Sequence, residues 1–278
     1  MTVGLVTDSN AQLPPELVGR YGIEVVPLTV VVDGTPYLEG VELDADAFYA
    51  RFAAGVPSVS TAHPSPGQFA TAFAAQAARG ADEVLAVLIG SNVSGTVNAA
   101  RLAADAAPVP VRIVDSGTAS FGIACCVWEA GEALATGADV DQAAAVAETV
   151  AATVGNVFTV GALELARAGG RLVEEVGTGS GIPVLSLVEG TMRQAGEARD
   201  VDDAVDLMAG YVRGHGTGLR VAVGVADAAA GPLGQALETR LSGAPQIRDL
   251  VRYRVGPSVG VHTGPGTAGA FCYPARLP

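Results

Sequence analysis

Short apolar segments alternate with longer, alanine-rich segments of helical periodicity along the first 155 residues. The pattern predicts strands over residues 3–6, 24–32, 83–89 and 111–114, and helices from residue 14 and over 44–54, 65–79, 95–106, 119–134 and 141–154. Asp33-Gly34 is a turn signal that closes the second strand. A regular exchange of strands and helices is typical of a largely parallel sheet with helices on both faces.

The pattern becomes more mixed after residue 155. Strands are predicted over 157–160, 183–188, 191–194, 219–225, 246–255, 259–263 and 270–273, and helices over 163–168, 201–214 and 233–241. Glu189-Gly190 separates two of these strands as the turn of a hairpin. We therefore expect two α/β domains, residues 1–155 with a largely parallel sheet and residues 156–278 with a mixed sheet.

The charge composition excludes several classes of protein. The chain of 278 residues has a formal net charge of −13, which argues against binding to nucleic acid or to an anionic membrane surface. All 16 basic residues are arginine, so Schiff-base chemistry, a lysine general base and a P-loop lysine are impossible.

Mean hydropathy is high, at +0.38, which raises the question of a membrane-spanning segment. The sequence has no apolar run of about 18 residues and no basic segment before the first apolar residues, so we expect neither a spanning helix nor a signal peptide. Cys125, Cys126 and Cys272 do not form a disulfide framework, which favours the cytoplasm. The three histidines are widely separated, and no structural metal or cofactor is expected.

Small polar residues follow the predicted strands at the edge where α/β proteins bind ligands. Thr7-Asp8-Ser9, residues 90–96 and Asp115-Ser116 stand at such strand ends, and Ser60-Thr61 precedes the helix over 65–79. Hydroxyl groups and first-turn amides at these places can bind an anion. The same residue types also serve as helix caps and turn formers, so both interpretations remain open for Asp8 and Asp115.

The ordered set of these motifs resembles the DegV family over nearly the whole chain. The segments that carry the resemblance are Val6-Thr7-Asp8-Ser9, Val26-Pro27-Leu28, Ser60-Thr61-x-x-Pro64-Ser65, Ser94-Gly95-Thr96, Val114-Asp115-Ser116, Gly169-Gly170-Arg171 and His262-Thr263-Gly264-Pro265-Gly266. The resemblance implies two α/β domains with a fatty-acid tunnel between them. It also implies a protein that binds a long-chain fatty acid and presents the carboxylate to a separate ATP-dependent fatty acid kinase subunit of a bacterium.

The resemblance also implies roles for individual residues. Thr61, Ser94 and His262 would bind the carboxylate, and Arg199, after the hairpin, would contact the kinase subunit. Residues that would line the tunnel or support the carboxylate site are Ser60, Ser91, Gly95, Thr96, Asp115, Ser116, Arg171 and Thr263. No residue is assigned a catalytic role, because nothing in this set supplies ATP-binding chemistry.

Two alternatives use other chemistry. An acyl hydrolase would use Ser94 as nucleophile, His262 as base and Asp115 to orient the base, although the residues around Ser94 do not form a Gly-x-Ser-x-Gly elbow. A binding protein for a sugar or phosphorylated metabolite is favoured only by glycine-rich loops such as residues 177–181, which lack a lysine.

Overall fold

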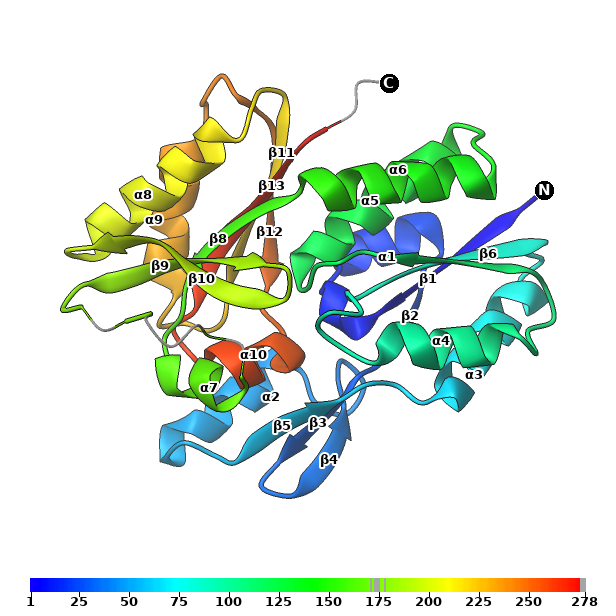
Figure 1. Ribbon diagram of the computed structural model, residues 1–278, viewed down its shortest axis with the longest axis horizontal. Coiled ribbons are helices and arrows are strands. Elements are labelled where there is room, and N and C mark those ends of the chain that lie inside the picture. Colours follow the sequence, from blue (N-terminus) through cyan, green and yellow to red (C-terminus); the bar gives the residue numbers. More distant parts are fainter. Residues whose placement is uncertain (171, 173–175, 178, 276–278) are drawn as a thin grey trace. The chain divides into compact units, whose positions relative to one another are not determined.

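The computed structural model describes residues 1–170, 172, 176–177 and 179–275. The chain forms two compact units. The first consists of Met1–Thr29 and Ala62–Thr153, and the second consists of Val30–Thr61 and Val154–Pro278. Each unit is an α/β structure with its own sheet (Figure 1).

The first unit contains a four-stranded parallel sheet in the order β2-β1-β6-β7. Its strands are β1 (Val3–Asp8), β2 (Glu24–Val26), β6 (Glu83–Leu88) and β7 (Val111–Asp115). The central strands β1 and β6 are almost completely buried, as expected for a parallel sheet with helices on both faces.

Helices cover both faces of this sheet (Figure 1). The helices of the unit are α1 (Pro15–Tyr21), α3 (Pro66–Ala78), α4 (Thr96–Ala104), α5 (Phe121–Ala135) and α6 (Val140–Thr153), with a 3₁₀ helix, η1, at Ser9–Ala11. Phe69, Phe73 and Val97 from α3 and α4 pack against Val6 and Val84 of the sheet. A capping box formed by Ser65 and Gln68 fixes the start of α3.

The second unit contains a six-stranded mixed sheet in the order β10-β9-β8-β13-β11-β12. β11 and β12 are parallel, and the other neighbouring strands that the structure describes pair antiparallel. Its strands are β8 (Gly155–Thr159), β9 (Ile182–Val188), β10 (Thr191–Ala198), β11 (Leu219–Val225), β12 (Ile247–Arg254) and β13 (Ala268–Pro274). β9 and β10 form the predicted hairpin, with Glu189 and Gly190 both at positive φ.

Several helices of the second half of the chain belong to this unit. They are α7 (Leu163–Ala168), α8 (Val201–Gly214), α9 (Gly231–Leu241) and α10 (Pro257–Thr263). Met208 of α8 and Leu237 of α9 share one core with Val221 of β11. Ala166 of α7 belongs to a second core with Leu185 of β9.

The segment before residue 62 adds a small sheet to the second unit. Its strands are β3 (Thr29–Val32), β4 (Thr35–Leu38) and β5 (Val59–Ala62), in the order β4-β3-β5. α2 (Ala45–Ala50) and the 3₁₀ helix η2 (Arg51–Ala54) lie between β4 and β5.

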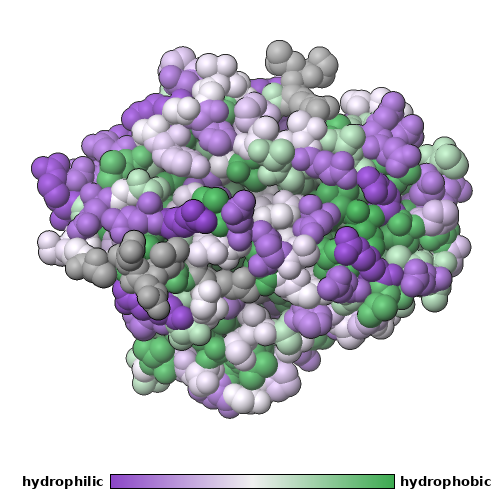
Figure 2. All heavy atoms as spheres, in the orientation of Figure 1, coloured by the Kyte–Doolittle hydropathy of each residue, from purple (hydrophilic) through white to green (hydrophobic). Residues whose placement is uncertain are grey.

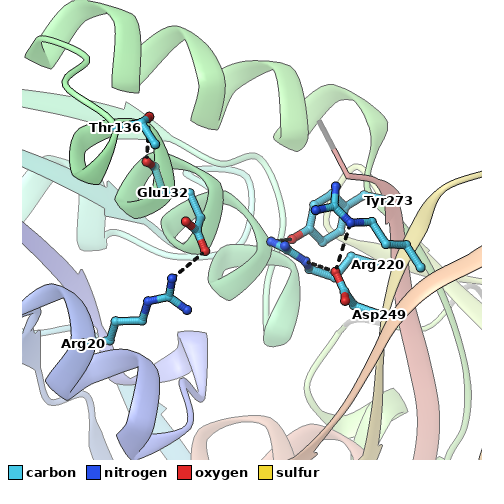
Figure 3. Close-up of polar contacts among 7 residues, drawn as sticks. Arg20, Glu132, Thr136, Arg220, Asp249 and Tyr273 are labelled. Atoms are coloured by element: carbon cyan, nitrogen blue, oxygen red, sulfur yellow. Dashed lines mark hydrogen bonds and ion pairs between the residues drawn. The ribbon is translucent and has the colours of Figure 1, made fainter. Parts of the chain in front are cut away.

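Each unit has a polar contact that links neighbouring elements (Figure 3). In the first unit, Arg20 of α1 forms an ion pair of 3.3 Å with Glu132 of α5. In the second unit, Arg220 of β11 is 3.2 Å from Asp249 of β12 and 3.5 Å from the hydroxyl of Tyr273.

Figure 2 shows hydrophilic and hydrophobic side chains interspersed on the visible face. Within the described ranges, no helix has the length and apolar character to cross a membrane.

The predicted two-domain α/β class is confirmed, with a parallel sheet in one unit and a mixed sheet in the other. The predicted domain of residues 1–155 does not include all of these residues, because residues 30–61 belong to the second unit. The predicted strand over 24–32 is two strands, since Pro27-Leu28 separates β2 from β3 and each joins a different sheet.

The strand predicted over 259–263 is wrong. These residues form α10, which begins at Pro257, a residue whose fixed φ suits the first helical position. Gly264 ends the helix with a φ of 74°. Ser258, Gly260, Val261 and Thr263 are all buried, so the short apolar pattern does not distinguish a helix from a strand.

Candidate functional site

The carboxyl edge of the parallel sheet gathers several of the predicted site residues of the first unit. The chain turns from β1 toward β2 on one side and continues through β6 and β7 on the other, so the topological switch point lies between β1 and β6. Open α/β sheets bind ligands at such a point. Ser91, Ser94, Gly95 and Thr96 follow β6, and Asp115 and Ser116 stand at the end of β7.

Asp8 and Asp115 stabilise the loops at this edge. Asp8 is completely buried, and its carboxylate accepts hydrogen bonds from the amides of Asn10, at 3.1 Å, and Ile89, at 2.8 Å. One Asp115 oxygen accepts from the amides of Ser91, at 3.0 Å, and Gly117, at 3.1 Å. Both aspartates thus have the turn-forming role that their position in the sequence allowed.

The surroundings of Asp115 favour its charged form. Partial burial by itself raises the pKa of this carboxyl group. Hydrogen bonds from the Ser91 hydroxyl and from the amides of Ser91 and Gly117, together with the charge of Arg101, outweigh that effect. The pKa of Asp115 therefore lies below its ordinary value of 3.8.

The loop that carries Ser94 is a tight turn. The carbonyl of Gly90 accepts hydrogen bonds from the amides of Val93, at 2.8 Å, and Ser94, at 3.0 Å. A Cβ atom at Gly90 would lie 2.7 Å from the backbone carbonyl carbon of Gly117, so the loop requires glycine there. The Ser94 hydroxyl lies 2.8 Å from that of buried Thr96, and its oxygen also accepts from the Thr96 amide at 3.4 Å.

This arrangement can bind an anion. Ser94 and Thr96 have one hydroxyl hydrogen each. Their mutual hydrogen bond uses one of these hydrogens, and the other can be donated to a ligand. Thr96 is also the first residue of α4, whose N-terminal amides and dipole favour negative charge. A carboxylate needs such donors rather than a formal positive charge.

His63 lies beside this loop. It was not among the residues predicted for the site. A Cβ atom at Gly95 would lie 3.1 Å from the His63 ring, so the imidazole packs against the residue that follows Ser94. The side chain of His63 is exposed. The place of His63 in the sequence, two residues after the predicted site residue Thr61, could have indicated that it lies near the site.

Thr61 and Ser60 lie on β5, the strand that precedes α3. Thr61 is half-buried and Ser60 is exposed, as the alternation along a strand produces. β5 pairs with β3 in the small sheet of the second unit.

His262 lies in the last turn of α10 and is half-buried. A Cβ atom at Gly169, the residue that ends α7, would lie 2.6 Å from the Nδ1 atom of His262. Thr263 is buried, and its hydroxyl donates to the carbonyl of Val259 at 3.2 Å. The carbonyl of Thr263 accepts from the amide of Ala162 at 3.2 Å, which fixes the end of α10 beside α7.

Arg199 lies between β10 and α8 with 85% of its side chain exposed. Its guanidinium donates to Asp203 at 2.9 Å, and its backbone amide donates to the same oxygen at 3.0 Å. The hydrogen bond with Asp203 raises the pKa of Arg199 and lowers that of Asp203. Arg171 and residue Thr178 of the glycine-rich loop lie outside the described residues.

The structure thus brings together the predicted residues of the first unit. Ser91, Ser94, Gly95, Thr96, Asp115 and Ser116 share one sheet edge in the first unit. Thr61 and His262 belong to the second unit, so their convergence with Ser94 on one carboxylate remains a prediction. In the part of the chain that the structure describes, no group of histidine, cysteine and acidic side chains is arranged to hold a metal ion.

Comparisons with known proteins extend over the full chain. The family model described as "Uncharacterised protein, DegV family" matches residues 2–275. A DegV domain-containing protein of Streptomyces coelicolor is 35% identical over 272 residues, which cover 96% of each chain.

Solved structures share the fold. A DegV family protein from Thermus thermophilus, described as fatty-acid binding, is 33% identical with a TM-score of 0.88, over 99% of this chain and 100% of the other. A DegV lipid-binding protein from Thermotoga maritima is 25% identical with a TM-score of 0.89, over 100% of both chains.

The fold and the polar sheet edge define a two-domain α/β protein with hydroxyl-rich loops at the carboxyl ends of its parallel strands. The chain belongs to the DegV family.

Proposed function

We propose that the protein binds one long-chain fatty acid, with the hydroxyl groups of Thr61 and Ser94 and the imidazole of His262 bonded to its carboxylate. The observation that carries the proposal is the hydroxyl pair of Ser94 and Thr96 at the start of α4, in a chain 33% identical to a fatty-acid-binding relative. In this proposal the acyl chain of the ligand is buried in an apolar tunnel of the protein.

Burial of the acyl chain can supply most of the binding free energy, so the carboxylate does not need a positively charged side chain as its partner. Burying about 14 methylene groups gains on the order of 10 kcal/mol at about 0.8 kcal/mol each, before ordering costs are subtracted. The carboxylate then has to keep hydrogen bonds comparable to those it had in water. Two hydroxyls, an imidazole and helix amides are sufficient donors for this.

The bound lipid serves as a substrate for another protein. We propose that the chain presents the carboxylate to a separate ATP-dependent kinase subunit, which forms the acyl phosphate, and that Arg199 contributes to docking. The exposure of Arg199 beside the β9–β10 hairpin supports this role. We place the protein in the cytoplasm of a bacterium, which suits the buried free thiols of Cys125, Cys126 and Cys272.

Mass spectrometry of the purified protein tests the binding proposal. Denaturing extraction should release a free fatty acid at about one equivalent per chain, because a buried site of this kind holds its ligand through purification. A protein that stays empty after incubation with fatty acids of several lengths would contradict the proposal. Recovery of a sugar or phosphorylated metabolite would assign a different ligand.

A fluorophosphonate probe tests the hydrolase alternative in the same sample. Only a serine activated by a neighbouring base reacts with the probe, and we expect Ser94 to remain unlabelled. The closest polar partner that the structure gives the Ser94 hydroxyl is the Thr96 hydroxyl, which is not a base. Labelling at Ser94 would favour the hydrolase.

A further inference from the structure

The short helix that carries His262 depends on other elements for its place. α10 has seven residues, which is about two turns. Isolated helices of this length are not stable in water, so tertiary contacts must fix both the helix and the direction of its side chains. Residues 39–49, which enter the second unit from the first half of the chain, supply several of these contacts.

Glu39 binds the N-terminus of α10. Its Oε1 atom accepts a hydrogen bond of 2.7 Å from the amide of Ser258, the second residue of the helix. Glu39 is 5% exposed and Ser258 is 2% exposed, so water screens this contact little. A buried carboxylate at a helix N-terminus combines a charge-assisted hydrogen bond with a favourable interaction with the helix dipole.

The loop of Glu39 is held by its own backbone. The carbonyl of Leu38 accepts from the amides of Glu42, at 2.8 Å, and Leu43, at 3.3 Å, while the amide of Gly40 donates to the carbonyl of Leu43 at 3.0 Å. Gly40 has a φ of 76°, which glycine adopts without strain. The carboxylate of Glu39 is therefore presented from a closed turn.

Two aromatic rings from α2 contact one side of α10. A Cβ atom at Gly260 would lie 2.6 Å from both Phe48 and the Tyr49 hydroxyl oxygen. Gly260 and His262 are separated by roughly 200° around the helix, so these rings contact the side nearly opposite His262. An ion pair between Asp46 and Arg254 joins α2 to the strand before α10.

We propose that Glu39 is a positioning residue for His262. Its carboxylate fixes the start of α10, the α2 rings fix one side, and His262 projects from the other side against Gly169. Glu39 does not touch the fatty acid but sets the direction of the imidazole that does. This role rests on the proposed function, in which His262 binds the carboxylate.

Affinity for palmitic acid, measured by isothermal titration calorimetry on delipidated full-length protein, tests the role. Glu39→Ala should weaken binding about tenfold, and Glu39→Gln, which keeps an acceptor oxygen, only about threefold. Glu42→Ala is the matched control, because it removes an exposed carboxylate of the same loop that accepts a hydrogen bond of 2.8 Å from the amide of Leu38 and not from α10. It should change affinity less than about twofold. Glu39→Ala binding as tightly as the wild type would overturn the inference.

A double-mutant cycle separates positioning from a general effect on folding. If Glu39 acts through His262, Glu39→Ala should add less than about twofold in a His262→Ala background. An additional loss of about tenfold in that background would reject positioning in favour of a structural role. Should Glu39→Ala not fold, Glu39→Gln replaces it in the cycle: no further loss in the His262→Ala background supports positioning, and the full loss of about threefold rejects it.

Nuclear magnetic resonance of the lipid-free protein tests the positioning of His262 without a bound fatty acid. Its result therefore does not depend on the proposed function. The imidazole resonances of His262 should shift in Glu39→Ala and Glu39→Gln but not in Glu42→Ala, while those of His63 and His215 stay in place. Unmoved His262 resonances would overturn the positioning role. The two proposals can fail separately. If the wild type binds no palmitic acid but substitution of Glu39 still shifts the His262 resonances, the proposed function is overturned and the positioning role stands.

Discussion

Ser94 has a defined partner and a defined place, which makes it the sharpest test at the scale of single residues. Its hydroxyl is 2.8 Å from that of Thr96 at the first residue of α4. Ser94→Ala should weaken fatty-acid binding by about 1–3 kcal/mol, because the carboxylate loses a hydrogen-bond donor in the proposed site. His262→Ala should have an effect of the same order.

Calorimetric titration with a fatty acid measures this loss. Thr71→Ala, which removes an exposed hydroxyl bonded to the carbonyl of Gly67 in α3, is the control and should bind as the wild type does. Circular dichroism should show an unchanged fold in each variant. Unchanged affinity in both Ser94→Ala and His262→Ala would reject the assigned carboxylate site.

Asp115 predicts a pH dependence of stability. Its pKa is lower in the folded protein than the ordinary 3.8, because the hydrogen bonds of the Ser91 hydroxyl and of the Ser91 and Gly117 amides outweigh the effect of burial. A depressed carboxyl pKa stabilises the fold above the unfolded value and loses this contribution as pH falls through the folded value. Stability should therefore decline from about pH 4 downward.

Thermal unfolding of Asp115→Asn across the acidic range checks this expectation. The variant should have a lower Tm than the wild type at neutral pH, and the difference should narrow as the pH falls below about 4, since the wild-type carboxylate is then protonated. A difference in Tm that is the same at neutral and acidic pH would contradict it.

At the scale of elements, α10 is the clearest case of a segment shaped by its neighbours. The side of the helix at Gly260 has no room for a side chain, since a Cβ atom would lie 2.6 Å from both Phe48 and Tyr49. Gly260→Ala should destabilise the protein by about 1–3 kcal/mol through overpacking, although alanine favours helices more than glycine does.

Gly210→Ala provides the matched control for this prediction. Gly210 lies in α8, and a Cβ atom there would meet nothing within 4 Å. The same substitution at this position should stabilise the protein by about 0.5–1 kcal/mol. Urea denaturation compares the two variants, and a stabilising Gly260→Ala would show that α10 can move away from α2.

At the scale of the whole molecule, the proposed binding of a lipid and its proposed presentation to a kinase can be tested separately. Arg199 is exposed and paired with Asp203, so in the proposed function its charge would contribute to encounter with an acidic partner rather than to lipid affinity. Arg199→Glu should bind fatty acid normally but slow formation of acyl phosphate by the cognate kinase with ATP. The slowing should diminish as salt screens the charge.

Arg213→Glu is the control for Arg199→Glu. It makes the same change of charge at an exposed position of the last turn of α8. Phosphorylation of bound fatty acid at low salt should be near the wild-type rate in this variant. A wild-type rate in Arg199→Glu under the same conditions would show that Arg199 does not dock the kinase.

The sequence by itself determined the elements whose signals are local. Ser65-Pro66 with Gln68 specifies the start of α3, and Glu189-Gly190 specifies the hairpin of β9 and β10. The exchange of strands and helices specified the parallel sheet, and the hydroxyl-rich segments after β6 and β7 specified the polar edge that stays the predicted ligand-binding edge. Each of these signals depends on residues close together in the chain.

Only the tertiary structure decided where residues 30–61 belong and what form the His262 segment takes. Glu39 meets Ser258 across a sequence separation of 219 residues, and Asp46 meets Arg254 across 208. Residues 259–263 are short and apolar, so their periodicity fits a strand as well as a helix, and contacts with distant residues choose between them. Those contacts arise from chain topology, which a local pattern of residues does not encode.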